Sequence, residues 1–414
     1  MAVCILSVLY VWTLYNIPIL VVGVRHLRRS CQKGRKKSSL GKERLPTVSI
    51  VVPVRDEERV VGRLLKALLR VDYPPEKREI IIVEDGSVDK TVEICGEYAG
   101  RYPDQVRLLH QSVSNGKPSA LNYALKHVRG EIVAVFDADS VPEPDCLMRA
   151  VEYFEDPSIA VVQGRPCSIN ADENMLSKFI SYEEAVRYEA YLRGKDVLNL
   201  FVPLTGSCYF VRRSVLKEVG GWDDKSLSED MDLSARLMNG GYKIRYASDV
   251  RSWQENPVNF GQLFKQRVRW FRGCMEVSLK YGKLLRRIDR RCIDAEITMF
   301  GPFMFVPILL GYLLGIYGFL GSIHPDVFST VMAQGTMLLT TVTLFLIGMA
   351  LFYVTKPLKV GNLLWLPFIY FYWSLQAFIA LYAVLLILLR RPRVWVKTEK
   401  KGVVRNFALN VGSW

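Results

Sequence analysis

The sequence predicts an α/β domain with a mostly parallel sheet, joined to a helical transmembrane bundle. Apolar strands alternate with helical stretches between residues 47 and 136, and acidic residues follow several of these strands. Long uncharged stretches stand before and after this region. Strand–helix alternation is typical of parallel sheets with helices on both faces, and an uncharged stretch of about 20 residues is long enough to cross a bilayer.

The composition fits a folded protein at a lipid bilayer. Half of the 414 residues are hydrophobic, which excludes a disordered chain. Lys and Arg number 55 against 41 Asp and Glu, giving a net charge of +14. These cations gather beside the apolar stretches, at residues 25–44, 280–291 and 390–405, instead of covering one compact face. This pattern indicates a membrane partner and no nucleic acid.

Residues 1–24 are predicted to form a retained transmembrane helix, because no charge occurs between Ala2 and Val24. A signal peptide is disfavoured, since the basic residues follow the apolar run instead of preceding it. Residues 25–46 form a basic linker. The positive-inside rule places this linker, and the domain at residues 47–274, in the cytoplasm of a multi-pass protein of the cell membrane.

A second membrane region, residues 298–389, is predicted to contain about three helices. Their approximate bounds are residues 298–322, 327–354 and 363–389. Residues 275–297 are predicted to form an amphipathic interfacial helix, and residues 390–414 a basic tail. Three crossings would put this tail outside, against the positive-inside rule. Either that orientation is tolerated or the last stretch is not a plain span.

The cysteines and histidines give no sign of a zinc site, a disulfide framework or histidine chemistry. The eight cysteines show no C-x-x-C spacing, so neither a zinc site nor a disulfide framework is indicated. Only four histidines are present, and His26 and His324 lie beside predicted spans. Imidazole catalysis and histidine-rich metal binding are therefore not expected.

Polar residues follow the predicted strands of the cytoplasmic region. These strands are residues 48–54, 79–83, 106–110 and 132–136. Ligands of parallel sheets bind beyond the carboxyl ends of the strands. Three polar segments fall there: Arg55-Asp56, Glu84 to Ser87, and Asp137 to Ser140.

Three motifs in this order carry the chemistry. Asp137-Ala138-Asp139 closes a buried strand, and two carboxylates in this position suit a hard divalent cation and, through it, a diphosphate. Ser228-Glu229-Asp230 supplies a later carboxylate that can take a proton from an attacking hydroxyl. Gln266, Arg269 and Trp270 share one helix face, where they can meet a diphosphate and a sugar ring. Together the motifs indicate a sugar transferase.

The order of motifs resembles the family 2 glycosyltransferases over roughly residues 45–275. The likeness is closer to their membrane-integrated processive branch, which includes cellulose, chitin, hyaluronan and poly-N-acetylglucosamine synthases. It rests on Val52 to Glu57, Val83 to Ser87, Asn115 to Asn122, Asp137 to Asp139, Ser228 to Asp230, and Gln266-x-x-Arg269-Trp270. The resemblance implies a nucleotide-diphospho-sugar transferase domain of the GT-A fold.

For the donor site, the resemblance implies a UDP-sugar and a Mg²⁺ or Mn²⁺ ion. Asp137 and Asp139 would hold the ion, and Asp85 would accept a hydrogen bond from uracil. Without the resemblance, Asp85 reads equally well as part of an Asp-Gly turn. The donor-binding residues would be Pro53, Arg55, Glu57, Asp85, Lys117, Asp137 and Arg269. Arg55-Asp56 departs from the Tyr-Asn of many relatives.

For the acceptor, the resemblance implies that Asp230 is the general base of an inverting transfer. Glu229 is its rival, because an acid at a helix start can also serve the helix dipole alone. The acceptor-binding residues would be Gly206, Ser207, Glu229, Gln266 and Trp270. Phe352 to Lys356 resembles a gating segment of cellulose synthases, with Thr355 as its central residue.

The favoured hypothesis is a membrane-embedded enzyme that extends a polysaccharide from UDP-sugar and helps to translocate it. The alternative is a non-processive glycolipid synthase that adds one sugar to a ceramide, diacylglycerol or polyprenyl acceptor. A third hypothesis, a transporter or scaffold with a degenerate domain, is disfavoured by the intact Asp137, Asp139, Asp230 and Arg269. An oligomer or accessory secretion proteins are possible partners. The sequence carries no motif for the identity of the sugar.

Overall fold

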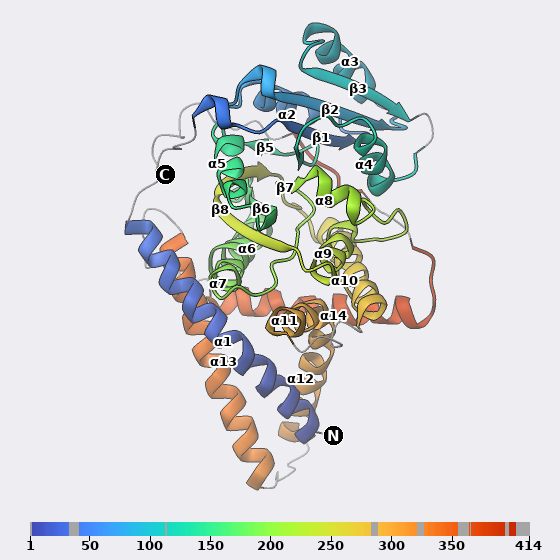
Figure 1. Cartoon of the computed structure of the whole chain (residues 1–414). Helices are drawn as coiled ribbons and strands as arrows, with labels where there is room; N and C mark the ends of the chain where they lie inside the picture. The colour runs from blue at the N-terminus through green and yellow to red at the C-terminus, as the bar shows by residue number, and fades with distance from the viewer. Residues whose placement is uncertain are drawn as a thin grey trace.

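The computed structural model describes an α/β domain above a stalk of long helices (Figure 1). The residues described are 2–32, 41–111, 114–282, 289–320, 327–354, 364, 366–393 and 397–402. The domain therefore occupies the middle of the chain, while both the amino-terminal and later segments contribute to the stalk.

One sheet of eight strands, in the order β3-β2-β1-β4-β7-β6-β8-β5, organises the domain. Its first four strands pair in parallel: β1 (Val48–Val54), β2 (Arg78–Asp85), β3 (Val106–Gln111) and β4 (Ile132–Val135). The others are β5 (Val141–Pro142), β6 (Ile159–Ser168), β7 (Tyr209–Arg212) and β8 (Lys243–Gln254). β7 pairs antiparallel with β4, and β6 pairs parallel with β8. The predicted mostly parallel α/β sheet is confirmed.

Both faces of the central strands β1 and β4 are buried, which explains their largely apolar sequences. Ile50 and Val52 of β1 belong to one core cluster, while Val51 between them belongs to the other. Helices cover the two faces: α2 (Val61–Leu69), α3 (Thr91–Arg101), α4 (Lys117–Leu125) and α5 (Cys146–Glu152). The short helices η1 (Lys42–Arg44), η2 (Pro75–Lys77) and η3 (Tyr153–Glu155) lie in the connections.

A second group of helices lies between the sheet and the stalk (Figure 1). It consists of α6 (Met175–Val186), the π-helix η4 (Arg187–Leu192), α7 (Arg193–Val197), α8 (Arg213–Glu218), α9 (Glu229–Asn239), α10 (Phe260–Tyr281), α11 (Arg290–Phe300) and η6 (Gly301–Met304). The predicted interfacial stretch 275–297 is thus divided between the end of α10 and the start of α11. Residues 283–288 between them lie outside the described chain.

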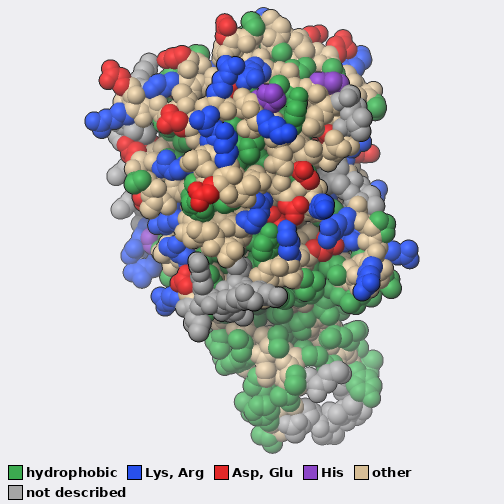
Figure 2. Space-filling model, turned by 45° about the vertical axis from the view of Figure 1, so that its right-hand side comes forward, with side chains coloured by type: hydrophobic (Ala, Val, Ile, Leu, Met, Phe, Trp, Pro, Cys, Tyr) green, Lys and Arg blue, Asp and Glu red, His purple; other side chains and the backbone are tan. Residues whose placement is uncertain are grey.

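Among the residues that the structure describes, four helices are long and apolar enough to cross a membrane. The helices concerned are α1 (Ala2–Gln32), the segment from α11 through α12 (Phe305–Leu320), α13 (Val327–Val354) and α14 (Leu366–Leu388). α1 continues beyond the predicted end at Val24, through the basic residues that follow it. Figure 2 shows hydrophobic side chains gathered on the stalk, with Lys and Arg above it on the domain.

Glycines let α1 approach the domain closely. A Cβ on Gly23 would lie 1.8 Å from the carbonyl oxygen of Ala190, and one on Gly194 would lie 2.1 Å from that of Ile19. The same contact region contains a buried ion pair, in which Lys195 Nζ lies 2.7 Å from Asp294 Oδ1. α1 is therefore packed against the domain as well as against its neighbours in the stalk.

α14 runs across the base of the domain instead of along the stalk (Figure 1). Its Ile379, Ala380 and Ala383 pack against Phe271 and Met275 of α10. Residues 389–393, which follow α14, stay beside the domain.

Two contacts hold that following segment in place. Arg272 donates a hydrogen bond of 3.0 Å to the carbonyl of Pro392, and Arg393 forms an ion pair of 2.8 Å with Glu276. Of the two alternatives for the last apolar stretch, this geometry favours a helix that is not a plain span.

Candidate active site

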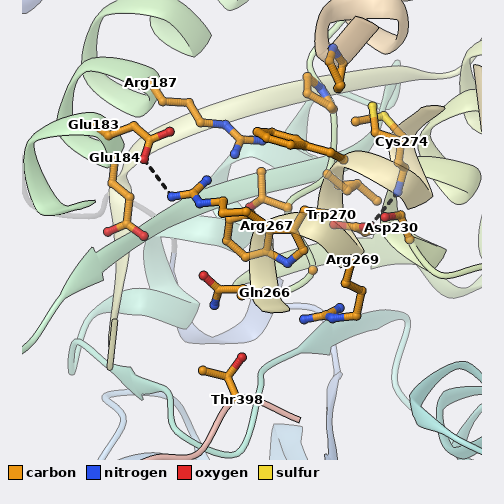
Figure 3. Close-up of a pocket in the computed structure, with 18 of the residues that line it drawn as sticks. Glu183, Glu184, Arg187, Asp230, Gln266, Arg267, Arg269, Trp270, Cys274 and Thr398 are labelled. Atoms are coloured by element: carbon orange, nitrogen blue, oxygen red, sulfur yellow. Dashed lines mark hydrogen bonds and ion pairs between the residues drawn. The ribbon is translucent and has the colours of Figure 1, made fainter. Parts of the chain in front are cut away.

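A cavity of about 740 Å³ begins at the carboxyl ends of the parallel strands and reaches the stalk helices. All predicted site residues except Ser207 line it, and Ser207 lies directly behind, where its hydroxyl accepts a hydrogen bond from the amide of Asp137 (3.0 Å). Figure 3 shows part of the lining, including Asp230, Gln266, Arg269 and Trp270. Residues far apart in the sequence therefore converge on one space.

The two aspartates after β4 each face a lysine. Lys117 Nζ lies 2.7 Å from Asp137, and Lys400 Nζ lies 2.7 Å from Asp139. Asp139 also accepts a hydrogen bond of 3.1 Å from the amide of Glu255. Burial opposes the ionisation of Asp139, but the pairing with Lys400 outweighs it and lowers the pKa of this carboxyl. Asp139 is therefore held as a carboxylate.

This pair of carboxylates fits a cation that also binds a diphosphate. Among the described residues no group of three or more His, Cys, Asp or Glu side chains converges, so the protein offers two ligands and not a full cage. Mg²⁺ characteristically binds one or two carboxylates and takes its other ligands from phosphates and water. The Lys400 ammonium pairs with Asp139, so it would compete with such an ion for this carboxylate.

Lys117 connects three parts of the site. Its ammonium lies 2.7 Å from Asp137 and 3.1 Å from Glu229, and donates a hydrogen bond of 2.9 Å to the carbonyl of Gly206. Burial alone would lower the pKa of Lys117, but the two carboxylates raise it above its ordinary value. The lysine predicted to lie near the diphosphate is thus partly buried and is held in its charged form by two carboxylates.

Gly206 allows this close approach. Its φ of +81° is unfavourable for residues with a side chain, and an added Cβ would lie 3.4 Å from Asp230 Oδ2. The glycine therefore leaves room between Lys117 and Asp230.

The adjacent acids at the start of α9 differ in their surroundings. Glu229 pairs with Lys117, whereas Asp230 accepts a hydrogen bond of 2.8 Å from the amide of Met231. Burial, and then the negative charge of Glu229, raise the pKa of Asp230 to about 6. A carboxylate with such a pKa is better suited to accept a proton near neutral pH than an ordinary aspartate.

The α10 residues line the cavity as predicted, and Arg267 joins them. Arg267 pairs with Glu183 at 2.7 Å and lies over the Trp270 ring at 4.6 Å (Figure 3). In the described chain the Oε1 atom of Gln266 is buried without a hydrogen-bond partner. A buried acceptor of this kind is costly unless a ligand hydroxyl or water donates to it.

At the opposite end, Asp85 holds the loop that precedes α4. Its carboxylate accepts hydrogen bonds from the amides of Asn115 and Gly116, both 3.0 Å, and from the Ser114 hydroxyl at 2.8 Å. Arg55 also donates to the Ser114 hydroxyl, at 2.9 Å. Asp85 and Arg55 thus shape the edge of the cavity through one loop, and the contact of Asp85 with uracil stays a prediction.

Sequence reasoning missed the part played by the carboxyl-terminal segment. Besides Lys400, Lys397 approaches Glu57 at 3.4 Å, and the amide of Lys401 donates to the Glu255 carboxylate at 2.9 Å. Burial raises the pKa of Glu57 to about 7 in spite of Lys397. The basic residues of the tail were interpreted only as flanking a membrane span, and no strand or helix pattern marked them as part of a site.

The predicted gating segment cannot be compared with this geometry. Thr355 and Lys356 lie outside the described residues, and Phe352 and Tyr353 belong to the end of α13.

The membrane end of the cavity was missed as well. It is lined by residues of the stalk helices and of α14, among them Trp12, Leu20, Phe305, Ile308, Tyr312, Ile347, Tyr370 and Trp373. In sequence these residues are indistinguishable from lipid-facing ones, because hydropathy does not reveal which face of a helix meets a cavity.

Comparisons with known proteins agree with this geometry. Residues 46–273 match the family described as glycosyltransferase like family 2. A probable glycosyltransferase of Bacillus subtilis (strain 168), YdaM, is 32% identical over 302 residues, which cover 71% of each chain.

Two other relatives differ from each other in product. The β-monoglucosyldiacylglycerol synthase of Nostoc sp. is 34% identical over 58% of this chain and 52% of its own length. The poly-β-1,6-N-acetyl-D-glucosamine synthase of Staphylococcus epidermidis is 32% identical over 56% of each chain. The chain therefore matches only about half the length of these two proteins.

A solved structure has the same fold. The mannosyltransferase PcManGT from Pyrobaculum calidifontis, in complex with GDP-Man and Mn²⁺, superposes with a TM-score of 0.60 at 18% identity, covering 94% of this chain and 100% of the other. The predicted GT-A fold is thus confirmed. With its family match over more than half of its length, the chain belongs to the family 2 glycosyltransferases.

Proposed function

We propose that the protein transfers a sugar, with inversion, from a UDP-sugar to a hydroxyl group of a lipid-borne acceptor at the cytoplasmic membrane surface. The observation that carries this proposal is the continuity of the cavity. It runs from Asp137 and Asp139, past Asp230 and Trp270, to side chains of the stalk helices. A hydrophilic donor and a membrane-bound acceptor can therefore enter from opposite ends.

The donor end would hold the nucleotide diphosphate. Asp137 and Asp139 would bind Mg²⁺ or Mn²⁺, which neutralises charge on the departing diphosphate when it is bound. Lys117, paired with two carboxylates, and Arg269 would supply fixed positive charge close to the phosphates. PcManGT contains Mn²⁺ with a nucleotide-diphosphate sugar, which supports a similar requirement here.

Asp230 would act at the junction of donor and acceptor. It takes the proton of the acceptor hydroxyl as the oxygen bonds to the anomeric carbon and the bond from that carbon to the diphosphate breaks. A single displacement of this kind inverts the linkage. Glu229 is the weaker candidate for this step, because its carboxylate is paired with Lys117.

The arrangement of the membrane helices favours a lipid-borne acceptor. With α14 lying across the base of the domain, the described helices that would cross the membrane are α1, α12 and α13. So few helices offer little enclosure for a polysaccharide, whose hydroxyl groups need hydrogen-bond partners inside the bilayer. After the domain the chain would then cross the membrane twice, by α12 and α13, so the basic tail would lie on the same side as the domain. This agrees with the positive-inside rule.

Synthesis of a growing polysaccharide is the second candidate. It is supported by the poly-N-acetylglucosamine synthase relative and by the aromatic side chains along the cavity, such as Trp270, Tyr312 and Trp373, on which sugar rings can stack. This candidate requires a second copy or accessory protein to complete the translocation path.

Product analysis distinguishes the two candidates. The purified protein, in phosphatidylcholine nanodiscs with Mn²⁺, would receive radiolabelled UDP-glucose, UDP-N-acetylglucosamine or UDP-glucuronate together with a diacylglycerol, ceramide or polyprenol acceptor. We expect one sugar per lipid, and at least a roughly 100-fold loss in the Asp230→Asn variant. A long polymer as the main product would contradict the lipid-borne acceptor and support the polysaccharide candidate.

The raised pKa of Asp230 predicts a pH dependence. Above this pKa of about 6 the carboxylate is ionised and can accept a proton, so kcat/KM should rise with pH through about 6 and then level off. Glu229→Gln removes the neighbouring negative charge and should move this rise to lower pH. The exposed Glu93→Gln variant is the control. An unchanged profile in Glu229→Gln would show that another group limits the reaction.

The ion pair of Lys400 with Asp139 predicts competition between the tail and the divalent cation. Lys400→Met should tighten Mn²⁺ binding to the donor-free enzyme by something on the order of tenfold, because a charged hydrogen bond no longer opposes it. Calorimetric titration measures this affinity. Lys401→Met, which removes only the pairing with Glu173, should bind Mn²⁺ like the wild type. Equal affinities in all three proteins would contradict the competition.

A further inference from the structure

Arg187 is a cation in the cavity that the mechanism above does not use. It opens the π-helix η4, which joins α6 to α7, and its side chain extends into the pocket on the side of Glu183 and Glu184 (Figure 3). π-helical turns are rare and are frequently found at functional sites. Four residues later, Tyr191 lines the same cavity.

The neighbouring carboxylates do not neutralise Arg187. Glu183 is bound to Arg267 at 2.7 Å and accepts hydrogen bonds from Tyr372 at 2.9 Å and Gln376 at 3.2 Å. Glu184 accepts a hydrogen bond of 3.0 Å from Asn256. Burial raises the pKa of Glu184 to about 7, so it carries only part of a negative charge at neutral pH.

Arg187 itself forms a looser contact. Its guanidinium lies 5.9 Å from the centre of the Tyr188 ring, and in the part of the chain that the structure describes no carboxylate pairs with it. A half-buried cation without a counterion is unfavourable unless water or a ligand anion compensates it. This section of the cavity therefore attracts negative charge.

We propose that Arg187 is an anion subsite that binds a phosphate group of the acceptor lipid. The inference rests on the proposed transfer to a lipid-borne acceptor and adds the chemistry of its headgroup. Arginine suits this role because its planar fork can donate two parallel hydrogen bonds to a phosphate.

The surroundings of Arg187 match an amphiphile with an anionic head. On one side lies the catalytic end with Asp230. Leu20 of α1 and Ile347 of α13 pack in one apolar cluster with Val186, the residue before Arg187, and both also line the cavity. A headgroup at Arg187 would therefore place its chain toward the bilayer and its acceptor hydroxyl toward Asp230.

Calorimetry on the full-length protein in phosphatidylcholine nanodiscs tests the subsite with three probes: dodecyl phosphate, the uncharged 1-O-dodecylglycerol, and inorganic phosphate. The wild type should bind dodecyl phosphate about tenfold more tightly than dodecylglycerol, and Arg187→Gln should lose this preference while dodecylglycerol binding stays the same. The exposed Arg25→Gln variant should retain the preference, because Arg25 is not part of the cavity lining.

Three results would overturn the inference: no preference in the wild type, an unchanged preference in Arg187→Gln, or competition by inorganic phosphate as strong as that by dodecyl phosphate. The last would indicate a site for free phosphate instead of a lipid headgroup. UDP binding in the presence of Mn²⁺ should be the same in Arg187→Gln and wild type, which checks the fold. Absence of any transfer by the wild type would instead contradict the proposed function.

Discussion

The site depends on the partly buried ammonium group of Lys117. Three acidic or polar groups from distant parts of the chain, Asp137 after β4, the carbonyl of Gly206 and Glu229 at the start of α9, all contact this group. Without it, the buried Glu229 carboxylate and the partly exposed Asp137 carboxylate would lie near each other with no positive charge between them, which is unfavourable for the buried group. The same charge that permits this convergence is then available to a diphosphate. Asp230, which stands outside the ion pair, keeps a raised pKa.

The stalk helices and the carboxyl-terminal segment both contribute residues to the cavity. α1 is fixed against the domain by the glycine contacts at Gly23 and Gly194, and so presents Trp12 and Leu20 to the cavity. α14 lies across the base, so the chain returns to the domain and brings Lys400 to Asp139. A soluble catalytic domain alone would lack both the membrane end of the cavity and the lysine that pairs with Asp139.

Much of this organisation could be predicted from the sequence, and the missing parts have physical reasons. The strands at 48–54 and 132–136 and the convergence of their polar ends follow from local patterns, since a buried strand is a continuous apolar run. The course of α14 does not, because hydropathy measures how apolar a helix is and not what covers it. Lys400 and Arg187 were missed for a related reason. Their roles come from tertiary contacts and from a π-helical turn that no local motif announces.

The central claim is that donor binding and proton removal belong to different residues that meet in one cavity. Calorimetric titration of the Asp230→Asn variant with UDP-sugar and Mn²⁺ tests it most directly, together with an assay of transfer on the same sample. The account predicts an affinity for the donor like that of the wild type and a rate of transfer lower by roughly 100-fold or more. Loss of donor binding in parallel with transfer would place Asp230 in the donor site and contradict the account.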